Sequence, residues 1–450
     1  MNVIGIDIGT TTLSAVALAP DGRVLEAVTR PNGADMPAGA TWQRHQDPER
    51  IVESVIGLAD ELMARHPPVA AIGLDGQMHG ILYVNAAGRA VSPLFTWQDG
   101  RGDLPLEDGT YASVLSRRTG CPMATGFGLT THFFNQMNGA VPEGAAKICT
   151  IADYAAMRLA GRSAPLTHAS NAASMGLFDM PSGEWDRIAF ANANMDRAIL
   201  PEVETGICAV GAYRGAAVSA ALGDNQASFI GSVRDMAKSV LVNIGTGGQI
   251  SMMSDASGAL IAAERRPLVD KAYLLVGSSL CSGRAYQILE KFLRSCARLA
   301  GCDAGNLYSA MNEAGLGALA LPDNPVVSPL FTGTRKNPAL RGGIHNLSPE
   351  NFDAGRLVGA TLCGMAQELY DLYLDMLRAG AGAPEALVGS GNGIRKNPAL
   401  RMAFEARFRM PLFIPAHEEE AAYGAALYGM AASGLAPSLP AAQALIRYGA

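Results

Sequence analysis

The stretch "IGIDIGTTTLSAV", residues 4–16, decides how the chain begins to fold. An apolar run over residues 3–8 predicts a buried strand, the glycine-threonine run at 9–12 predicts a tight turn, and residues 13–18 predict a second strand. A Pro-Asp-Gly turn then leads to a third expected strand over residues 23–29. Connections this short favour an antiparallel meander over a strand–helix–strand start.

The same pattern returns in the second half of the chain as "LVNIGTGGQISMM", residues 241–253. Each copy has an apolar strand, Asp7 or Asn243, the sequence Ile-Gly-Thr, small residues and another apolar strand. Two interpretations remain open at this point. The chain contains either a duplicated domain, with one copy in each half, or two unrelated glycine-rich hairpins.

Composition limits the class of protein. The 450 residues allow two or three domains, and 49% apolar with 17% charged residues is typical of globular chains. The net charge of −6 and a pI near 5.7 argue against non-specific nucleic-acid binding. No apolar run reaches the roughly 20 residues that span a bilayer, and the strand-like start predicts no signal peptide. Seven scattered cysteines without a C-x-x-C pair favour a reducing compartment. We therefore expect a soluble cytoplasmic protein that binds neither nucleic acid nor membrane.

Three glycine turns are candidates for phosphate binding: "DIGTTT" (7–12), "NIGTGG" (243–248) and "VGSGNG" (388–393). Each follows an apolar run and offers backbone N–H groups beside hydroxyls, a combination that forms an anion-binding concavity. A Gly-Lys P-loop and a G-x-G-x-x-G after the first strand are both absent. Any one turn alone is better explained as a hairpin. Three together favour a nucleotide held between two lobes.

Two carboxylates call for an explanation. Asp7 ends the first strand beside a candidate phosphate loop, where it either binds a metal ion or caps its own turn. Asp224, within "ALGDNQASF", is a lone acid among small and apolar residues, and a buried unpaired carboxylate is costly. Asp224 is either a helix N-cap, a functional group, or both.

Other segments predict local structure. Residues 48–65 have helical periodicity and 69–74 read as a strand, followed by the loop "DGQMHG". The heptapeptide "RKNPALR" occurs at 335–341 and again at 395–401. The second copy predicts a helix start with Asn397 as N-cap, whereas the first runs into two glycines and predicts a loop. The repetition itself has no functional interpretation.

The strand–Asp-x-Gly-Thr-Thr–strand opening, its echo and the late glycine turn resemble the actin-like ATPase superfamily. Within it, "GQMHG" (76–80), "WQDGR" (97–101), "GDNQA" (223–227) and "GSGNG" (389–393) are similar to the FGGY carbohydrate kinases, in order over nearly the whole chain. "TWQDGR", "ATGFG" and "ALGDNQAS" are most similar to the sedoheptulokinase branch. Xylulokinases share "GQMHG", and the G-T-G-G of the second loop departs from the serine-rich versions common in the sedoheptulokinase branch.

The resemblance implies an α/β fold of two actin-like (ribonuclease H-like) domains, residues 1–232 and 233–450, with the active site in the interdomain cleft. It implies ATP and Mg²⁺ as cofactors, a small sugar as substrate, Asp224 as catalytic base and Asp7 as metal ligand. The implied sugar-binding residues are Gln77, Met78, His79, Trp97, Asp99, Arg101, Asn225 and Gln226. The implied nucleotide-binding residues are Thr10, Thr11, Thr12, Gly245, Thr246, Gly247, Gly389, Ser390, Gly391, Asn392 and Asn397. Small residues over 417–429 imply a closely packed helix behind the adenine pocket.

The resemblance thus predicts phosphorylation of the terminal hydroxyl of a ketose, with sedoheptulose as the best candidate and xylulose or another ketose or polyol as the alternative. Taken alone, His79 and Trp97 are better explained as core residues. Arg335 either approaches a phosphate or is a solvated surface residue. Two other classes remain: a non-catalytic sugar-binding regulator and an actin- or chaperone-like ATPase. The family is compatible with a homodimer, and no motif decides the oligomeric state.

Overall fold

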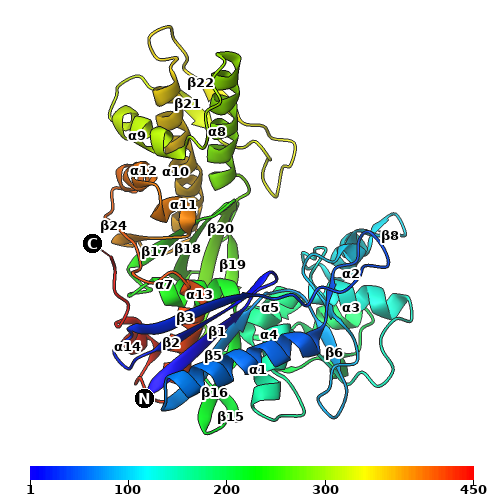
Figure 1. The fold of residues 1–450 in the computed structure, drawn as a ribbon. Helices are drawn as coiled ribbons and strands as arrows, with labels where there is room; N and C mark the ends of the chain where they lie inside the picture. The colour runs from blue at the N-terminus through cyan, green and yellow to red at the C-terminus, as the bar shows by residue number, and fades with distance from the viewer. Residues whose placement is uncertain (450) are drawn as a thin grey trace. The chain divides into compact units, whose positions relative to one another are not determined.

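The structure, a computed structural model, describes residues 1–449 and forms two compact units (Figure 1). The first unit contains Met1–Arg234, Arg266–Ala272 and Glu419–Ile446, and the second contains Asp235–Arg265, Tyr273–Glu418 and the residues from Arg447 onward. The predicted boundary between residues 232 and 233 stays a prediction about domains.

The first unit is built on a six-stranded sheet in the order β15-β16-β5-β1-β2-β3. The expected antiparallel meander is present, since β1 pairs with β2 and β2 with β3. β5 and β16 then add in parallel, and β15 is an antiparallel edge strand. The strands are β1 (Asn2–Ile8), β2 (Thr12–Leu18), β3 (Val24–Pro31), β5 (Val69–Gly76), β15 (Ala209–Tyr213) and β16 (Ala216–Gly223).

Helices pack against both faces of this sheet. One face packs through Ile4, Ile6 and Ile8 against α1 (Pro48–Arg65) and α4 (Ile151–Leu159), which confirms the predicted helix over 48–65. The opposite side chains of β1 face α13 (Glu420–Ala432), which also packs on α7 (Asp224–Ser232). Strand side chains alternate between faces, so the sequence period places Gly5 and Asp7 on the α13 side.

The α13 backbone lies directly on the sheet because two strand glycines leave room for it. A Cβ on Gly5 would lie 1.8 Å from the Ala422 carbonyl oxygen, and a Cβ on Gly73 would lie 1.8 Å from the Ala425 carbonyl oxygen. The small residues of this segment do serve close packing, as expected. Their predicted place behind an adenine pocket stays a prediction; in the structure α13 belongs to the first unit and covers β1, β5 and α7.

The rest of the first unit surrounds a second apolar cluster that includes Tyr83, Leu129 and Phe190. Its strands are β4 (His45–Gln46), β6 (Leu82–Val84), β7 (Leu94–Phe95), β8 (Pro105–Leu106), β9 (Gly109–Thr110), β10 (Lys147–Cys149), β11 (Leu166–His168), β12 (Phe178–Asp179), β13 (Glu184–Trp185) and β14 (Glu202–Glu204). Its helices are η1 (Gly100–Asp103), α2 (Tyr111–Thr119), α3 (Gly128–Met137), α5 (Ala169–Met175), α6 (Arg187–Asn192), η2 (Arg197–Ile199) and, near the end of the chain, α14 (Leu439–Gln443).

The second unit repeats the strand pattern of the first. In its sheet, β19-β20-β18-β17-β23-β24, β17 and β18 form the antiparallel hairpin predicted from the mid-chain echo, β20 extends the meander, and β23 and β24 add in parallel. The order β20-β18-β17-β23-β24 corresponds, strand by strand, to β3-β2-β1-β5-β16 of the first unit. This correspondence favours the duplicated-domain interpretation over two unrelated hairpins. The strands are β17 (Ser239–Ile244), β18 (Gly248–Ser254), β19 (Glu264–Pro267), β20 (Tyr273–Ser279), β23 (Ala386–Ser390) and β24 (Leu412–Phe413).

The remaining elements of the second unit are α8 (Ser282–Leu299), α9 (Tyr308–Leu319), β21 (Val326–Ser328), β22 (Gly343–His345), α10 (Ala354–Arg378), α11 (Asn392–Arg395) and α12 (Pro398–Phe408). The two "RKNPALR" copies differ as predicted. Asn397 caps α12 by accepting a hydrogen bond from the Leu400 N–H at 3.0 Å, and residues 335–341 form a loop.

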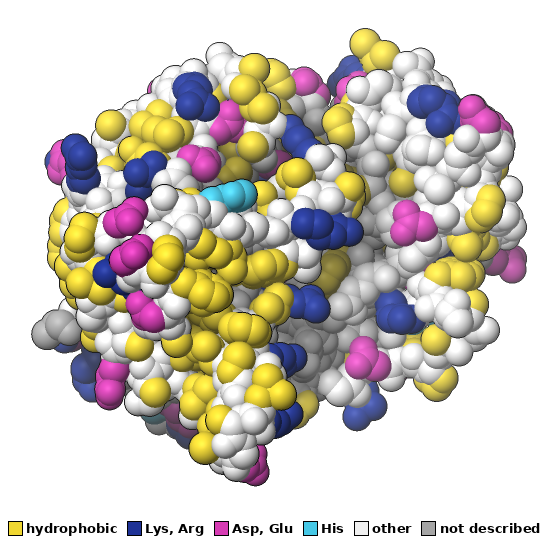
Figure 2. All heavy atoms as spheres, turned by 90° about the horizontal axis from the view of Figure 1, so that it is seen from above, with side chains coloured by type: hydrophobic (Ala, Val, Ile, Leu, Met, Phe, Trp, Pro, Cys, Tyr) yellow, Lys and Arg dark blue, Asp and Glu magenta, His cyan; other side chains and the backbone are white. Residues whose placement is uncertain are grey.

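The surface agrees with the modest net charge. On the face in Figure 2, basic and acidic side chains are dispersed among hydrophobic and other residues. Within residues 1–449, no helix is long and apolar enough to cross a membrane.

Candidate active site

Three carboxylates gather at one edge of the first unit's sheet. Asp7 and Asp75 are direct register partners near the ends of the parallel strands β1 and β5. Asp224 follows β16, the next parallel strand, and is the first residue of α7. The carboxyl ends of parallel strands are where ligands bind in open α/β sheets. The sequence predicted Asp7 and Asp224 as site residues but missed Asp75.

Burial and mutual repulsion change how these acids ionise. Burial, followed by the charge of Asp224, raises the pKa of Asp7 to about 7. Burial and the adjacent Asp7 raise the pKa of Asp75 well above its usual range. Burial also raises the pKa of Asp224 to about 6, although the Asn225 N–H and the Arg266 charge pull that pKa down. A carboxylate with such a pKa remains ionised at neutral pH and is a better base than an exposed one.

Asp224 is not the N-cap of its helix, because Gly223 occupies that position. The first turn of α7 nevertheless suits a carboxylate, since the helix dipole is positive there. The next two residues are held by the 266–272 segment: Gln226 Nε2 donates to the Pro267 carbonyl at 2.8 Å, and Arg266 donates to Asn225 Oδ1 at 3.3 Å. Met78 lies beside Gly223, where an added Cβ would be 2.8 Å from the Met78 thioether.

A chain of hydrogen bonds connects Trp97 with the first glycine turn, residues 7–12. The indole N–H of Trp97 donates to Thr10 Oγ1 at 3.0 Å, and Thr10 Oγ1 donates to Gln77 Oε1 at 3.1 Å. Gln77 Nε2 in turn donates to Gln46 Oε1 at 3.0 Å, and Gln46 Nε2 donates back to the Thr10 carbonyl at 2.8 Å. The Trp97 side chain is 47% exposed, so its ring is open to solvent and it is not a core residue. Thr11 and Thr12 are exposed in the same turn.

His79 is held in an unusual backbone conformation. Its φ of 73° lies in the left-handed region, which costs energy for a residue other than glycine and is typical of functional sites. The ring stacks on Phe127 with centroids 4.9 Å apart, and Nδ1 is 2.7 Å from the Ser174 carbonyl oxygen. These contacts fix the imidazole next to Met78.

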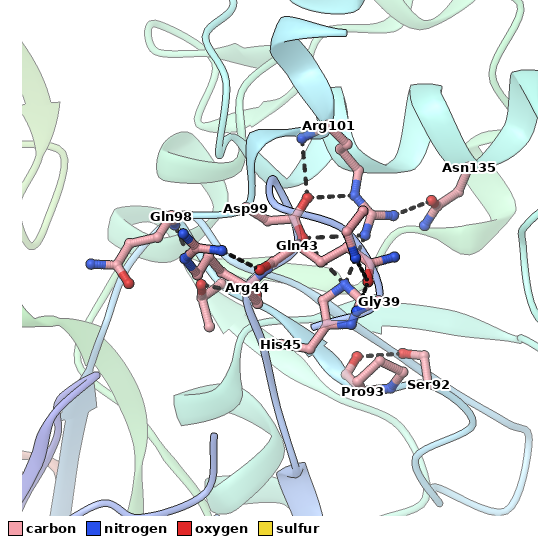
Figure 3. Close-up of polar contacts among 12 residues, drawn as sticks. Gly39, Gln43, Arg44, His45, Ser92, Pro93, Gln98, Asp99, Arg101 and Asn135 are labelled. Carbon is pink, nitrogen blue, oxygen red and sulfur yellow. Dashed lines mark hydrogen bonds and ion pairs between the residues drawn. The ribbon is translucent and has the colours of Figure 1, made fainter. Parts of the chain in front are cut away.

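Asp99 and Arg101 form a buried network (Figure 3). Arg101 is 4% exposed; its Nε donates to Asp99 Oδ1 at 2.7 Å, and its guanidinium also donates to Asn135 Oδ1 and contacts His45 Nε2 at 3.0 Å. Although burial raises the pKa of Asp99, hydrogen bonds from His45 and Arg101 outweigh it and hold that pKa at about 2. The charges of this pair are engaged with each other and with neighbouring side chains, which braces the loop that carries Trp97. Direct contact of either residue with sugar stays a prediction.

The second unit contains a pocket of about 610 Å³. Among the predicted nucleotide residues, Gly245, Thr246, Asn392 and Asn397 line it, whereas Gly247, Gly389, Ser390 and Gly391 lie outside its lining. The structure adds residues that the sequence analysis missed: Gly283, Tyr286, Gln287, Tyr308, Asn312 and Lys396. Five of them lie in α8 and α9, where no motif marks them, and Lys396 lies in the second "RKNPALR" segment, whose repetition has no functional interpretation.

One part of the pocket lining is aromatic, and another part comes from the second glycine turn and the start of α8. The Tyr286 and Tyr308 rings stack with centroids 5.9 Å apart, and the Tyr286 hydroxyl donates to Asn312 Oδ1 at 2.8 Å. The start of α8 lies against the second glycine turn, where the Arg284 N–H donates to the Thr246 carbonyl at 2.8 Å. A flat apolar surface beside a helix N-terminus suits a nucleobase and its phosphates. Arg335 forms an ion pair with Glu264 at 3.0 Å, and both side chains are exposed.

Comparison with known proteins identifies the family. The model of the FGGY carbohydrate kinase N-terminal domain matches residues 2–241, and that of the C-terminal domain matches residues 241–433. The chain belongs to the FGGY family of carbohydrate kinases. The predicted family and the α/β fold with two actin-like domains are therefore confirmed, and the actin- or chaperone-like alternative loses its support. FGGY kinases use ATP.

Several relatives extend over nearly the whole chain. A sedoheptulokinase from Mus musculus is 28% identical over 94% of this chain and 96% of its own length, and a glycerol kinase from Delftia acidovorans is 26% identical over 98% and 93%. Among solved structures, a xylulose kinase from Rhodospirillum rubrum has a TM-score of 0.85 at 21% identity, covering 100% of this chain and 93% of its own. Glycerol kinase from Plasmodium falciparum with ADP has a TM-score of 0.81 at 16% identity, with the same coverage. These structures establish the fold.

Proposed function

We propose that the protein uses Mg²⁺ and ATP to phosphorylate the terminal hydroxyl of a ketose, with sedoheptulose, converted to sedoheptulose 7-phosphate, as the first candidate. The observation that carries this proposal is Asp224, a carboxylate with a pKa of about 6 in the first turn of α7, beside Met78 and two further acids. A group of this kind orients a hydroxyl and accepts its proton.

In the proposed reaction, the terminal hydroxyl oxygen of the sugar attacks the γ-phosphorus. Its proton passes to Asp224, the bond from the γ-phosphorus to the β–γ bridging oxygen breaks, and ADP leaves. Asn225, Gln226, Met78, His79 and the Trp97 ring are the proposed sugar contacts. Such transfer depends mainly on positioning and charge stabilisation, which the hydrogen-bonded loop around Trp97 and Thr10 supports.

Mg²⁺ is proposed to bind at Asp7. The residues fit a hard cation: Asp7 Oδ1 is buried and has no hydrogen-bond partner within residues 1–449, and carboxylate oxygens are the ligands that Mg²⁺ prefers. When bound, the cation would offset negative charge on the phosphate oxygens. The nucleotide is proposed to bind the pocket lined by Tyr286, Thr246 and Asn392, with phosphates toward the glycine turns.

The choice of sedoheptulose rests on the sequence. The "TWQDGR" and "ALGDNQAS" motifs and the mouse and human sedoheptulokinases, 28% and 27% identical, support it. Xylulose is the alternative because "GQMHG" also resembles xylulokinases. A seven-carbon sugar needs more room beside Trp97 and His79 than a pentulose does.

The test is ADP release with Mg-ATP against sedoheptulose, xylulose, ribulose, fructose, glycerol and no sugar. Asp224→Asn is run beside wild type, with Asp255→Asn at an exposed position as the matched control. The proposal is supported if turnover is highest with sedoheptulose and if Asp224→Asn loses turnover while Asp255→Asn keeps it. Preference for xylulose would retain the mechanism and replace the substrate. Sugar-independent hydrolysis, or no turnover with any sugar, would reject the proposed kinase activity and favour a sugar-binding regulator.

A further inference from the structure

Asp75 is a buried carboxyl group that the proposed mechanism leaves unused. It lies near the end of β5 with 0% exposure, and neither of its carboxylate oxygens has a hydrogen-bond donor among residues 1–449. No Lys, Arg or His of the described chain forms an ion pair with it or with Asp7. An ionised carboxylate without a partner is expensive to bury, so this position takes up either a proton or a positive ligand.

The register of the sheet places Asp75 beside Asp7. The two residues are paired across the parallel strands β1 and β5, and their side chains share the face that α13 covers. Adjacent strands lie about 4.8 Å apart, so the two register partners are neighbours on that face. The other charged groups that act on this pair are the acids Asp224 and Glu419. The surroundings therefore add negative charge and supply no cation from the protein.

The donor set selects the class of ligand. Four carboxylate oxygens, three of them buried and unpartnered, suit a hard divalent cation. The described part of the chain has no group of three or more His, Cys, Asp or Glu side chains arranged to hold a metal ion. Mg²⁺ and Mn²⁺ are typically bound by one or two carboxylates, and water and phosphate oxygens fill the other coordination positions. Structural zinc sites and calcium sites take more ligands from the protein, so this pair of acids does not match them.

We propose that Asp75 is a second protein ligand, together with Asp7, for the divalent cation of this kinase, so that the cation binds before the nucleotide arrives. The catalytic use of that cation rests on the proposed function, whereas its binding does not. A site with one carboxylate depends on nucleotide phosphates to retain the cation. Two buried carboxylates with no competing cation form a site that is occupied without nucleotide.

The test measures Mn²⁺ binding to the nucleotide-free protein, by the loss of the free-Mn²⁺ electron paramagnetic resonance signal and by calorimetry. Wild type is expected to bind one Mn²⁺. Asp75→Asn is expected to weaken that binding by about ten-fold or more, at least the loss seen when a supporting partner of a metal ligand is removed. Asp255→Asn, an exposed change of the same chemistry, is expected to bind as wild type does.

Thermal unfolding in EDTA and in Mn²⁺ gives a second readout. Mn²⁺ is expected to raise the Tm of wild type but not of Asp75→Asn. In EDTA, Asp75→Asn is expected to melt at or above wild type, because a neutral amide replaces a buried carboxyl group that lies next to Asp7. If Asp75→Asn does not fold, Asp75→Ser is used in its place in both assays. No Mn²⁺ binding by nucleotide-free wild type, or equal binding by wild type and both Asp75 variants, would overturn the inference. If wild type binds Mn²⁺ but phosphorylates no sugar, the inference about Asp75 is retained and the proposed function is rejected.

Discussion

At the residue scale, the ionisation of Asp224 sets the pH range of the proposed reaction. Only the carboxylate form accepts the sugar proton, and burial raises its pKa to about 6. We expect kcat to be constant near neutral pH and to fall about ten-fold per pH unit below about pH 6. Because the Arg266 charge lowers this pKa, Arg266→Gln should move the acidic limb to higher pH. The measurement is kcat against pH for both proteins; identical acidic limbs would exclude Arg266 from setting the pKa of the base.

The Trp97 indole is expected to hold the first glycine turn as well as offer its ring to the sugar. Trp97→Phe keeps a ring and removes the 3.0 Å donation to Thr10 Oγ1. A lost hydrogen bond of about 1 kcal/mol predicts a KM for ATP that is several-fold higher, with a smaller change in the KM for sugar. Trp185→Phe is the control, because it removes the indole donation to the Pro201 carbonyl in the apolar cluster. If Trp97→Phe leaves the KM for ATP unchanged, Trp97 has no role in positioning the glycine turn for ATP and acts only in sugar binding.

At this scale the sequence predicted Asp7 and Asp224, because each occurs within a recognisable motif. It did not predict Asp75, which precedes "GQMHG" inside an apolar strand and becomes significant only through its pairing with Asp7. It also could not indicate that the charges of Asp99 and Arg101 are engaged with each other, since their partners His45 and Asn135 come from distant segments.

At the element scale, the contact of α13 with the sheet depends on glycine. Gly73→Ala would place a Cβ 1.8 Å from the Ala425 carbonyl oxygen, and neither backbone can yield without moving the helix. Overpacking of this kind predicts a loss of about 3 kcal/mol or more in the free energy of unfolding. Gly57→Ala is the matched control: it lies in α1, is exposed and has no atom within 4 Å of the added Cβ, so a gain of about 0.5–1 kcal/mol is expected. Urea unfolding compares the two variants, and equal stabilities would contradict the close approach.

The elements themselves were largely predictable from the sequence. The meander followed from alternation and turns, α1 from its periodicity, and α12 from its Asn-Pro start. The position of α13 was not predictable. Its small residues indicate a close neighbour but not which one, and the strands that it covers lie almost the whole chain away.

At the scale of the whole molecule, the two units are expected to divide the substrates. The pocket proposed for the nucleotide lies within the second unit and the sugar contacts are proposed in the first, so a change in the pocket should alter ATP use alone. Tyr286→Ala removes the ring that stacks on Tyr308, and an aromatic contact of about 1 kcal/mol predicts a KM for ATP that is several-fold to about ten-fold higher. Tyr286→Phe retains the ring and loses only the bond to Asn312, so its KM should rise less. Sedoheptulose binding without nucleotide, measured by calorimetry, should be unchanged in both variants. A parallel loss of sugar affinity would show that the pocket serves more than the nucleotide.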